Sequence, residues 1–131
     1  MKVGRLVLLG LVTLIALFMG LNAGLWLIVP ARAAKVLEMP LLTGSGLSSQ
    51  MDIGAFFMSA ATFAALALFT RDRPWFIAAS VMLLGAAAYR TGAFLFHGAP
   101  FLAHMVGIEI VMGSILITAS RVLGRGRESN G

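Results

Sequence analysis

The sequence predicts an all-α fold, namely an integral membrane four-helix bundle whose helices run antiparallel, up and down. Of its 131 residues, 60% are hydrophobic and 11% are charged, and the mean hydropathy is +0.96. An average soluble domain carries about one-quarter charged residues. A membrane helix needs about 20 apolar residues, so the chain is long enough for four crossings within a single domain over residues 1–131.

Four apolar segments, separated by short polar or proline-containing stretches, are the expected membrane spans. They cover residues 6–29, 52–69, 75–96 and 101–120. The connections at residues 71–74 and 97–100 are too short to allow anything but antiparallel neighbours. Up-and-down connectivity follows from these turns.

The longer connection, between the first and second spans, is expected to hold a short interfacial helix. Pro30 suits the first turn of a helix, and residues 31–39 can continue it until Pro40 and the glycine-rich residues 43–46 break it. After the fourth span, the basic and glycine-containing residues 121–131 are expected to be disordered.

The distribution of lysine and arginine predicts the orientation. Seven basic residues flank one side of the expected spans and two flank the other. The seven are Lys2, Arg5, Arg71, Arg73, Arg121, Arg125 and Arg127, and the two are Arg32 and Lys35. Because cytoplasmic loops carry the excess of lysine and arginine, we expect a multi-pass protein of the cell inner (plasma) membrane with both termini in the cytoplasm.

Small residues in the spans are expected to mark the helix contacts, because helices in lipid associate through close backbone approach. Gly20 and Gly24 form a GxxxG pair, and residues 59–65 and 85–88 are rich in alanine and glycine. A compact bundle is the resulting prediction. Trp26 and Trp75 are interpreted as anchors at the two membrane boundaries.

Arg90 and Glu109 are the most informative residues, because a charged side chain at the bilayer centre costs about 2.5–3.5 kcal/mol on insertion scales. At about 1.5 Å per helical residue, they lie roughly 9 Å and 12 Å from the same end of their spans. An ion pair between them across an antiparallel hairpin is therefore predicted.

Further polar residues fall at similar depth, so a polar layer in the outer half of the bundle is the central prediction. Its candidate members are Asn22, Asp52, Tyr89, Arg90, His104 and Glu109. One hypothesis is an internal ion pair that fixes helix register. The other is a small-molecule site in which Glu109 or Asp52 is an acid or base and Arg90 holds an anionic or carbonyl group.

No cofactor and no metal are expected from the motifs. The chain has no cysteine and no HExxH pattern, and Pro100 interrupts the seven-residue spacing between His97 and His104. The glycine-rich residues 43–46 lack a Walker lysine, so nucleotide binding is not expected. The basic residues sit at span ends, which fits lipid rather than nucleic acid as the partner.

A combination of landmarks is similar to a known family. They are Pro30 before a short amphipathic stretch, the DIGAFF sequence at residues 52–57, Arg90 followed by His97-Gly98, and the membrane residue Glu109. In these the chain resembles the small four-helix bacterial membrane proteins of domain of unknown function family 4345. The resemblance implies a four-span bundle over nearly the whole chain and implies no known activity.

Three functions remain open from the sequence. The first is an accessory or binding membrane protein, with a partner membrane protein, a second copy of the chain or a lipophilic small molecule as its ligand. The second is a compact membrane enzyme, of isomerase or hydrolase type, acting on a lipophilic small molecule. The third is a transporter or proton pathway, which intramembrane charges can mark.

Overall fold

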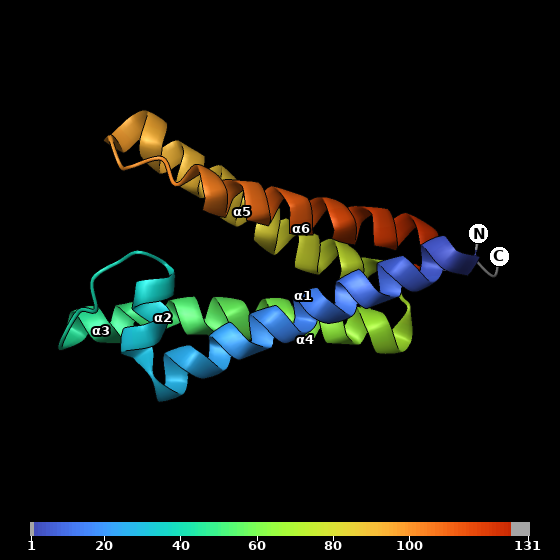
Figure 1. The fold of residues 1–131 in the computed structure, drawn as a ribbon, viewed down its shortest axis with the longest axis horizontal. Coiled ribbons are helices and arrows are strands. Elements are labelled where there is room, and N and C mark those ends of the chain that lie inside the picture. The colour runs from blue at the N-terminus through green and yellow to red at the C-terminus, as the bar shows by residue number, and fades with distance from the viewer. Residues whose placement is uncertain (1, 127–131) are drawn as a thin grey trace.

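The protein was analysed as a computed structural model, which describes residues 2–126. The four long helices are α1 (Lys2–Ile28), α4 (Asp52–Thr70), α5 (Arg73–His97) and α6 (Ala103–Val122), and the two short ones are α2 (Pro30–Val36) and α3 (Ser45–Gln50). Consecutive long helices run antiparallel (Figure 1). The predicted all-α, four-helix architecture is confirmed.

The short helices differ in how well the sequence indicated them. Helix α2 begins at Pro30, as expected, and lies within the predicted interfacial segment. Helix α3 was not expected, because residues 43–46 were interpreted only as a break. Gly44 adopts a positive φ of 60°, and the chain turns there into α3, which leads almost directly into α4.

Most of the apolar surface of the long helices faces outward. All four are long and apolar enough to cross a membrane, yet only 22–28% of the residues in their most apolar windows are buried within the protein. Leu17, Phe69 and Val111 are examples of exposed large apolar side chains. This is the arrangement of a multi-pass membrane protein, whose outer side chains are solvated by lipid.

The helices pack as two hairpins, α1 with α4 and α5 with α6, and the contacts between hairpins are fewer. In the first hairpin, the Cα of Gly54 approaches Trp26 so closely that an added Cβ would lie 2.9 Å from the Trp26 Cβ. In the second, a Cβ at Gly113 would lie 2.6 Å from Leu84 side-chain atoms, and Ser80 Oγ donates to the Gly113 carbonyl at 2.8 Å.

The sequence located the helix contacts only in part. Gly20 lies against Ala61, since an added Cβ would be 3.9 Å from the Ala61 Cβ. A Cβ at Gly24 or Gly85 would meet nothing within 4 Å, so these two glycines do not lie at a helix contact. Trp26 is completely buried, so its interpretation as a membrane-boundary anchor is wrong. A small residue on a helix permits close approach, and only the tertiary arrangement determines which one faces a neighbour.

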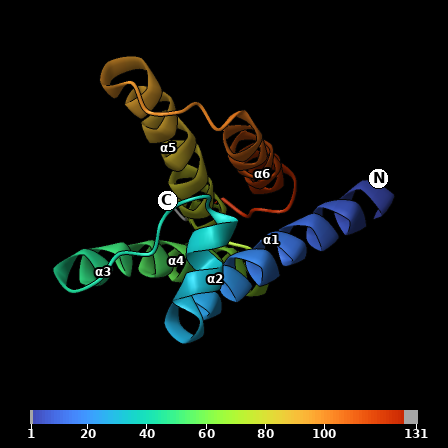
Figure 2. The ribbon, with the colours of Figure 1, turned by 60° about the vertical axis from the view of Figure 1, so that its left-hand side comes forward.

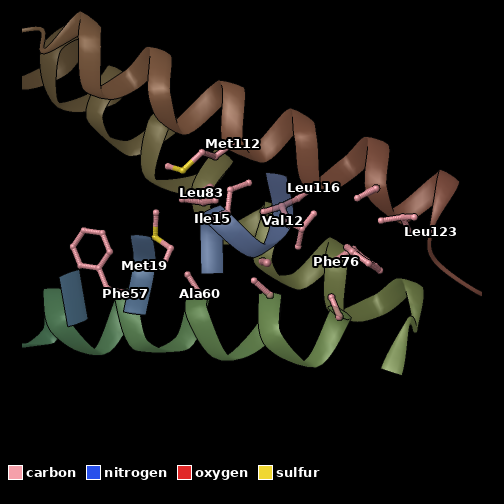
Figure 3. Close-up of a cluster of buried hydrophobic side chains, with 14 of the residues drawn as sticks. Val12, Ile15, Met19, Phe57, Ala60, Phe76, Leu83, Met112, Leu116 and Leu123 are labelled. Atoms are coloured by element: carbon pink, nitrogen blue, oxygen red, sulfur yellow. The ribbon is translucent and has the colours of Figure 1, made fainter. Parts of the chain in front are cut away.

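The two hairpins converge at one end of the molecule and diverge at the other (Figures 1 and 2). We call the end with the chain termini the closed end, and the end with α2, α3 and the α5–α6 turn the open end. Buried side chains from all four long helices meet in the middle and toward the closed end, among them Val12, Phe76 and Leu116 (Figure 3). The prediction of a compact bundle is correct only for this part.

Arginine side chains connect the helix ends by hydrogen bonds at the closed end. Arg5 Nη2 of α1 donates to the Val122 carbonyl at 2.8 Å, and Arg73 Nε of α5 donates to the Ser120 carbonyl at 3.1 Å. Both carbonyls belong to the last turn of α6, where backbone acceptors lack helical partners. These bonds tie both hairpins to the end of α6.

The segment after α6 adds a backbone contact with the α4–α5 turn. Arg125 accepts from the Arg73 N–H at 3.2 Å, and the Arg125 N–H donates to Arg71 O at 2.7 Å. The expectation of disorder from residue 121 is therefore wrong for residues 121–126, because α6 continues to Val122 and the backbone of Arg125 is hydrogen-bonded to the turn. The remainder of that tail, residues 127–131, lies outside the described residues.

The contact between Gly54 and Trp26 makes a testable prediction. Gly54→Ala should destabilise the protein by about 1–3 kcal/mol, because overpacking a tight contact costs this much and the added Cβ meets an atom next to the Trp26 backbone. Gly24→Ala is the matched control, since it makes the same chemical change in open space. Denaturation by sodium dodecyl sulfate measures both, and equal stabilities of the two variants would contradict this account of the helix contact.

Candidate functional site

A cavity of about 950 Å³ lies between the two hairpins at the open end. One wall comes from α1, α4 and the segment 36–39 after α2, and the other from α5, the 99–102 segment and α6. Ligand pockets in proteins typically measure about 300–1,000 Å³. The divergence of the hairpins therefore produces a space large enough for a small organic molecule.

The cavity walls are mainly apolar and rich in methionine. Five of the eight methionines line it, namely Met19, Met39, Met82, Met105 and Met112. Phe18, Phe56 and Phe57 add aromatic surface. Thioether side chains are flexible and polarizable, so they adapt to ligands of different shape.

The predicted ion pair between Arg90 and Glu109 is present on the α5–α6 wall. Arg90 Nε donates to Glu109 Oε1 at 2.8 Å, and both residues line the cavity. The antiparallel hairpin brings the two side chains to the same depth. The Glu109 side chain is 13% exposed and that of Arg90 is 32% exposed, so the pair is held in the wall with the arginine more accessible.

The pair does not use all of its hydrogen-bonding capacity. Arg90 donates only from Nε, and its two terminal nitrogens donate to no acceptor among residues 2–126. Within the same part of the chain, Glu109 Oε2 is buried without a hydrogen-bond partner. An arginine and a carboxylate paired in the bidentate geometry would leave fewer groups free. This arrangement therefore keeps donors available to a third group.

Asn22 lies in the opposite wall, on α1. It is buried, lines the cavity and donates from Nδ2 to the Phe18 carbonyl at 2.8 Å. That bond fixes the orientation of the amide, because the reverse orientation would place two carbonyl oxygens against each other. Asn22 Oδ1 is thus left as an acceptor.

A second ion pair joins the two hairpins at the mouth of the cavity. His104 Nε2 of α6 lies 3.0 Å from Glu38 Oε2, which follows α2, and both side chains are more than half exposed. The segment that carries Glu38 arches from α2 toward the α5–α6 hairpin (Figure 1). His104 was a predicted member of the polar layer, whereas Glu38 was missed because it lies outside the spans.

The backbone at Glu38 is unusual for a residue with a side chain. It has a φ of 55° just after the end of α2, a position that most often holds glycine. A left-handed conformation costs a non-glycine residue about 1–3 kcal/mol, and such strain concentrates at functional sites. Gln50 holds the following segment, since its Oε1 accepts from the Leu42 N–H at 2.9 Å and its Nε2 donates to the Pro40 carbonyl at 2.8 Å.

The structure separates the two remaining predicted members of the layer. Tyr89 lines the cavity but is 86% exposed, so it belongs to the rim. Asp52 is exposed and does not line the cavity. It is the first residue of α4, about a quarter turn from the face that carries Ile53, Phe56 and Phe57. Its expected place in the layer is therefore wrong, and its carboxylate instead lies near the positive end of the helix dipole.

Among residues 2–126, no group of three histidine, aspartate or glutamate side chains is arranged to hold a metal ion. His97 ends α5 and is exposed, outside the cavity lining.

No protein-family model, curated protein or solved structure matches the chain.

The Arg90–Glu109 pair predicts a non-additive effect on stability. Arg90→Leu should cost about 2–3 kcal/mol, somewhat less than the 3–5 kcal/mol of a fully buried pair, because Glu109 then stays in the wall without a counter-ion. The double variant Arg90→Leu, Glu109→Leu should recover most of that loss. Detergent-denaturation midpoints measure the cycle, with the exposed Arg32→Leu as control, and a double variant no more stable than Arg90→Leu would refute the coupling.

The contact across the mouth predicts selective crosslinking. Since the chain has no cysteine, Glu38→Cys with His104→Cys introduces a single reactive pair that a short bifunctional methanethiosulfonate should join within one molecule. Glu38→Cys with Ala103→Cys is the control, because residue 103 lies about 100° around the helix from residue 104. Mass spectrometry of the intact protein measures the yield, and equal yields for both pairs would show that the mouth is not arranged this way.

Proposed function

We propose that the protein is a membrane protein that binds a lipophilic small molecule in the cavity at the open end. The observation that carries this proposal is the cavity itself, about 950 Å³ in volume and lined mainly by apolar side chains, with the Arg90–Glu109 pair in its wall. A pair that served only to fix helix register would gain nothing from lying beside such a space. A few polar groups in an otherwise apolar pocket are typical of small-molecule sites.

The apolar and the polar side chains of the cavity contribute to binding in different ways. Burial of apolar ligand surface contributes about 25 cal/mol per Å², and the methionine and phenylalanine side chains supply that contact. The polar groups contribute orientation, because a buried donor or acceptor without a partner costs about 1–3 kcal/mol. Binding of an amphiphile would satisfy both requirements together.

The proposal includes a location and an orientation. The resemblance to the four-helix bacterial family and the seven-to-two distribution of basic residues support a bacterial inner membrane with both termini in the cytoplasm. The cavity then opens toward the outer side of that membrane. A ligand could enter from the outer leaflet or from the space outside.

A second candidate function is a membrane enzyme, and a specific observation favours it. Among residues 2–126, Glu109 Oε2 has no hydrogen-bond partner, and the terminal nitrogens of the neighbouring Arg90 donate to no acceptor. A carboxylate and a cationic hydrogen-bond donor at one site can act as acid or base and as electrostatic stabiliser of a carbonyl. Conversion of a bound compound that stops in Glu109→Gln, with binding retained, would separate an enzyme from a binding protein.

A transport pathway has less support, because the hydroxyl groups nearer the closed end are occupied. Thr13, Thr62 and Thr118 donate to carbonyls of their own helices, and Ser80 donates to Gly113 of α6. Arginine bonds to the end of α6 fasten the same end. These threonine and serine side chains therefore have no hydroxyl hydrogen left to donate to a transported group.

Filling the cavity tests the proposed function. Gly85 lines the cavity and an added Cβ meets nothing within 4 Å, so Gly85→Trp should occupy the space without displacing the helices. We expect saturable binding of 1-aminoanthracene, a neutral fluorophore, to the wild type and at least tenfold weaker binding to Gly85→Trp. Fluorescence titration in detergent, corrected for empty micelles, measures the affinity.

The matched control for this experiment is Gly107→Trp. Gly107 is also a helical glycine with open space around it, but it does not line the cavity. Wild-type affinity is therefore expected for this variant. Equal affinities of the Gly85 and Gly107 variants, or no saturable binding to the wild type, would overturn the proposal.

A further inference from the structure

We infer that the ligand is an uncharged amphiphile with two polar groups, a carbonyl-type oxygen that accepts from Arg90 and a hydroxyl or amide N–H that donates to Asn22. This inference rests on the proposed function and specifies its ligand class. It follows from which hydrogen-bonding atoms of the cavity are occupied and from the sum of its charges.

The Arg90 wall offers donors. Only Nε of Arg90 is used, by Glu109. Among the described residues, the buried side-chain nitrogen and oxygen atoms without a partner are Trp26 Nε1 and Glu109 Oε2. The terminal nitrogens of Arg90 are therefore accessible, and Arg90 lines the cavity. Arginine has no acceptor atom, so a ligand group that meets these nitrogens must provide one.

The Asn22 wall offers an acceptor. The Asn22 amide nitrogen is occupied by the Phe18 carbonyl, whereas no donor from the described residues reaches Oδ1, and Oδ1 is not one of the buried atoms without a partner. Since the residue is otherwise buried and lines the cavity, its oxygen is accessible from that side. A ligand group that meets Asn22 must donate a hydrogen bond.

The charges of the lining disfavour an anion, and the free donors of Arg90 disfavour a cation. Arg90 and Glu109 cancel, and Glu38 at the mouth is matched by His104 only when the imidazole is protonated. Together with the neutral Tyr89, the charged groups of the lining sum to zero or to −1. An anion would meet Glu109 beside Arg90 and Glu38 at the entrance, and a cation could accept nothing from Arg90. An uncharged carbonyl group avoids both penalties.

The opposite positions of donor and acceptor restrict the ligand further. Asn22 belongs to α1 and Arg90 to α5, so the two polar groups are in different hairpins and on different walls of the cavity. A molecule with only an acceptor leaves Asn22 Oδ1 without a partner, and a molecule with only a donor leaves Arg90 without one. A molecule that carries both an acceptor and a donor can satisfy both walls, while its hydrocarbon chain contacts the methionines.

Matched probes test this inference by displacement of 1-aminoanthracene. Four share a 12-carbon chain, namely 1-monolaurin, methyl laurate, laurate and dodecylamine, and the fifth is pentadecane, an alkane with as many heavy atoms as methyl laurate. One hydrogen bond contributes about 0.5–1.5 kcal/mol, which is up to about tenfold in affinity. We expect 1-monolaurin to displace the fluorophore at about tenfold lower concentration than methyl laurate, which lacks the donor, and methyl laurate to bind more tightly than pentadecane, which lacks the acceptor as well.

Two variants assign the polar contacts to their residues. Asn22→Leu removes Oδ1 at similar size and should abolish the advantage of 1-monolaurin over methyl laurate, because the leucine neither accepts from the hydroxyl nor leaves an unpaired oxygen beside methyl laurate. Arg90→Lys keeps a positive charge beside Glu109 but loses the guanidinium fork, and should reduce the advantage of both esters over pentadecane. Circular dichroism and gel filtration verify folding, and the probe series on the wild type tests the ligand class without any variant.

The outcomes distinguish the two proposals. Tightest binding of laurate or of dodecylamine would overturn the neutral class while leaving cavity binding intact. Equal affinities for all probes would show that the polar groups do not select the ligand. A wild type that never binds 1-aminoanthracene would instead refute the proposed function, on which this inference rests.

Discussion

The absence of a hydrophobic driving force between helices in lipid is the constraint on which the rest of this structure depends. Lipid chains are as apolar as the side chains they contact, so helices stay together only where backbones approach closely or hydrogen bonds join them. In this protein the close approaches lie within each hairpin, at Gly54 and Gly113. The bonds from Arg5 and Arg73 to the end of α6 lie at the closed end. Between the hairpins at the open end, the Glu38–His104 contact is the one carboxylate–imidazole contact among the described residues, and the cavity lies there between the hairpins.

The same constraint explains the chemistry of the cavity. Arg90 and Glu109 are tolerable in an apolar setting because they face each other at 2.8 Å across one hairpin, where each reduces the cost of burying the other. Their contact through a single nitrogen leaves further donors accessible. The Arg90–Glu109 contact thus lowers the cost of burying both charges and also leaves the terminal nitrogens of Arg90 free to donate to a ligand. Asn22, on the other hairpin, is the complementary acceptor.

The arginines at the closed end have two effects at once. Their number on that side is what orients a membrane protein under the positive-inside rule, and two of them also donate to carbonyls at the end of α6. Counting charges in the sequence indicates only the first effect. The second is structural, because a carbonyl without a helical partner is a good acceptor for a guanidinium group.

The sequence by itself determined the four spans, their antiparallel order and the Arg90–Glu109 pair, because hydropathy and helical rise depend only on position along the chain. It did not indicate α3, the pairing of Glu38 with His104, the burial of Trp26 or the position of Asp52 outside the cavity. These depend on rotation of each helix about its axis and on the path of a connection held by Gln50, neither of which hydropathy records. Only the tertiary structure decided that the hairpins diverge. Divergence depends on which small residues contact a neighbouring helix, and the sequence does not show which of them do.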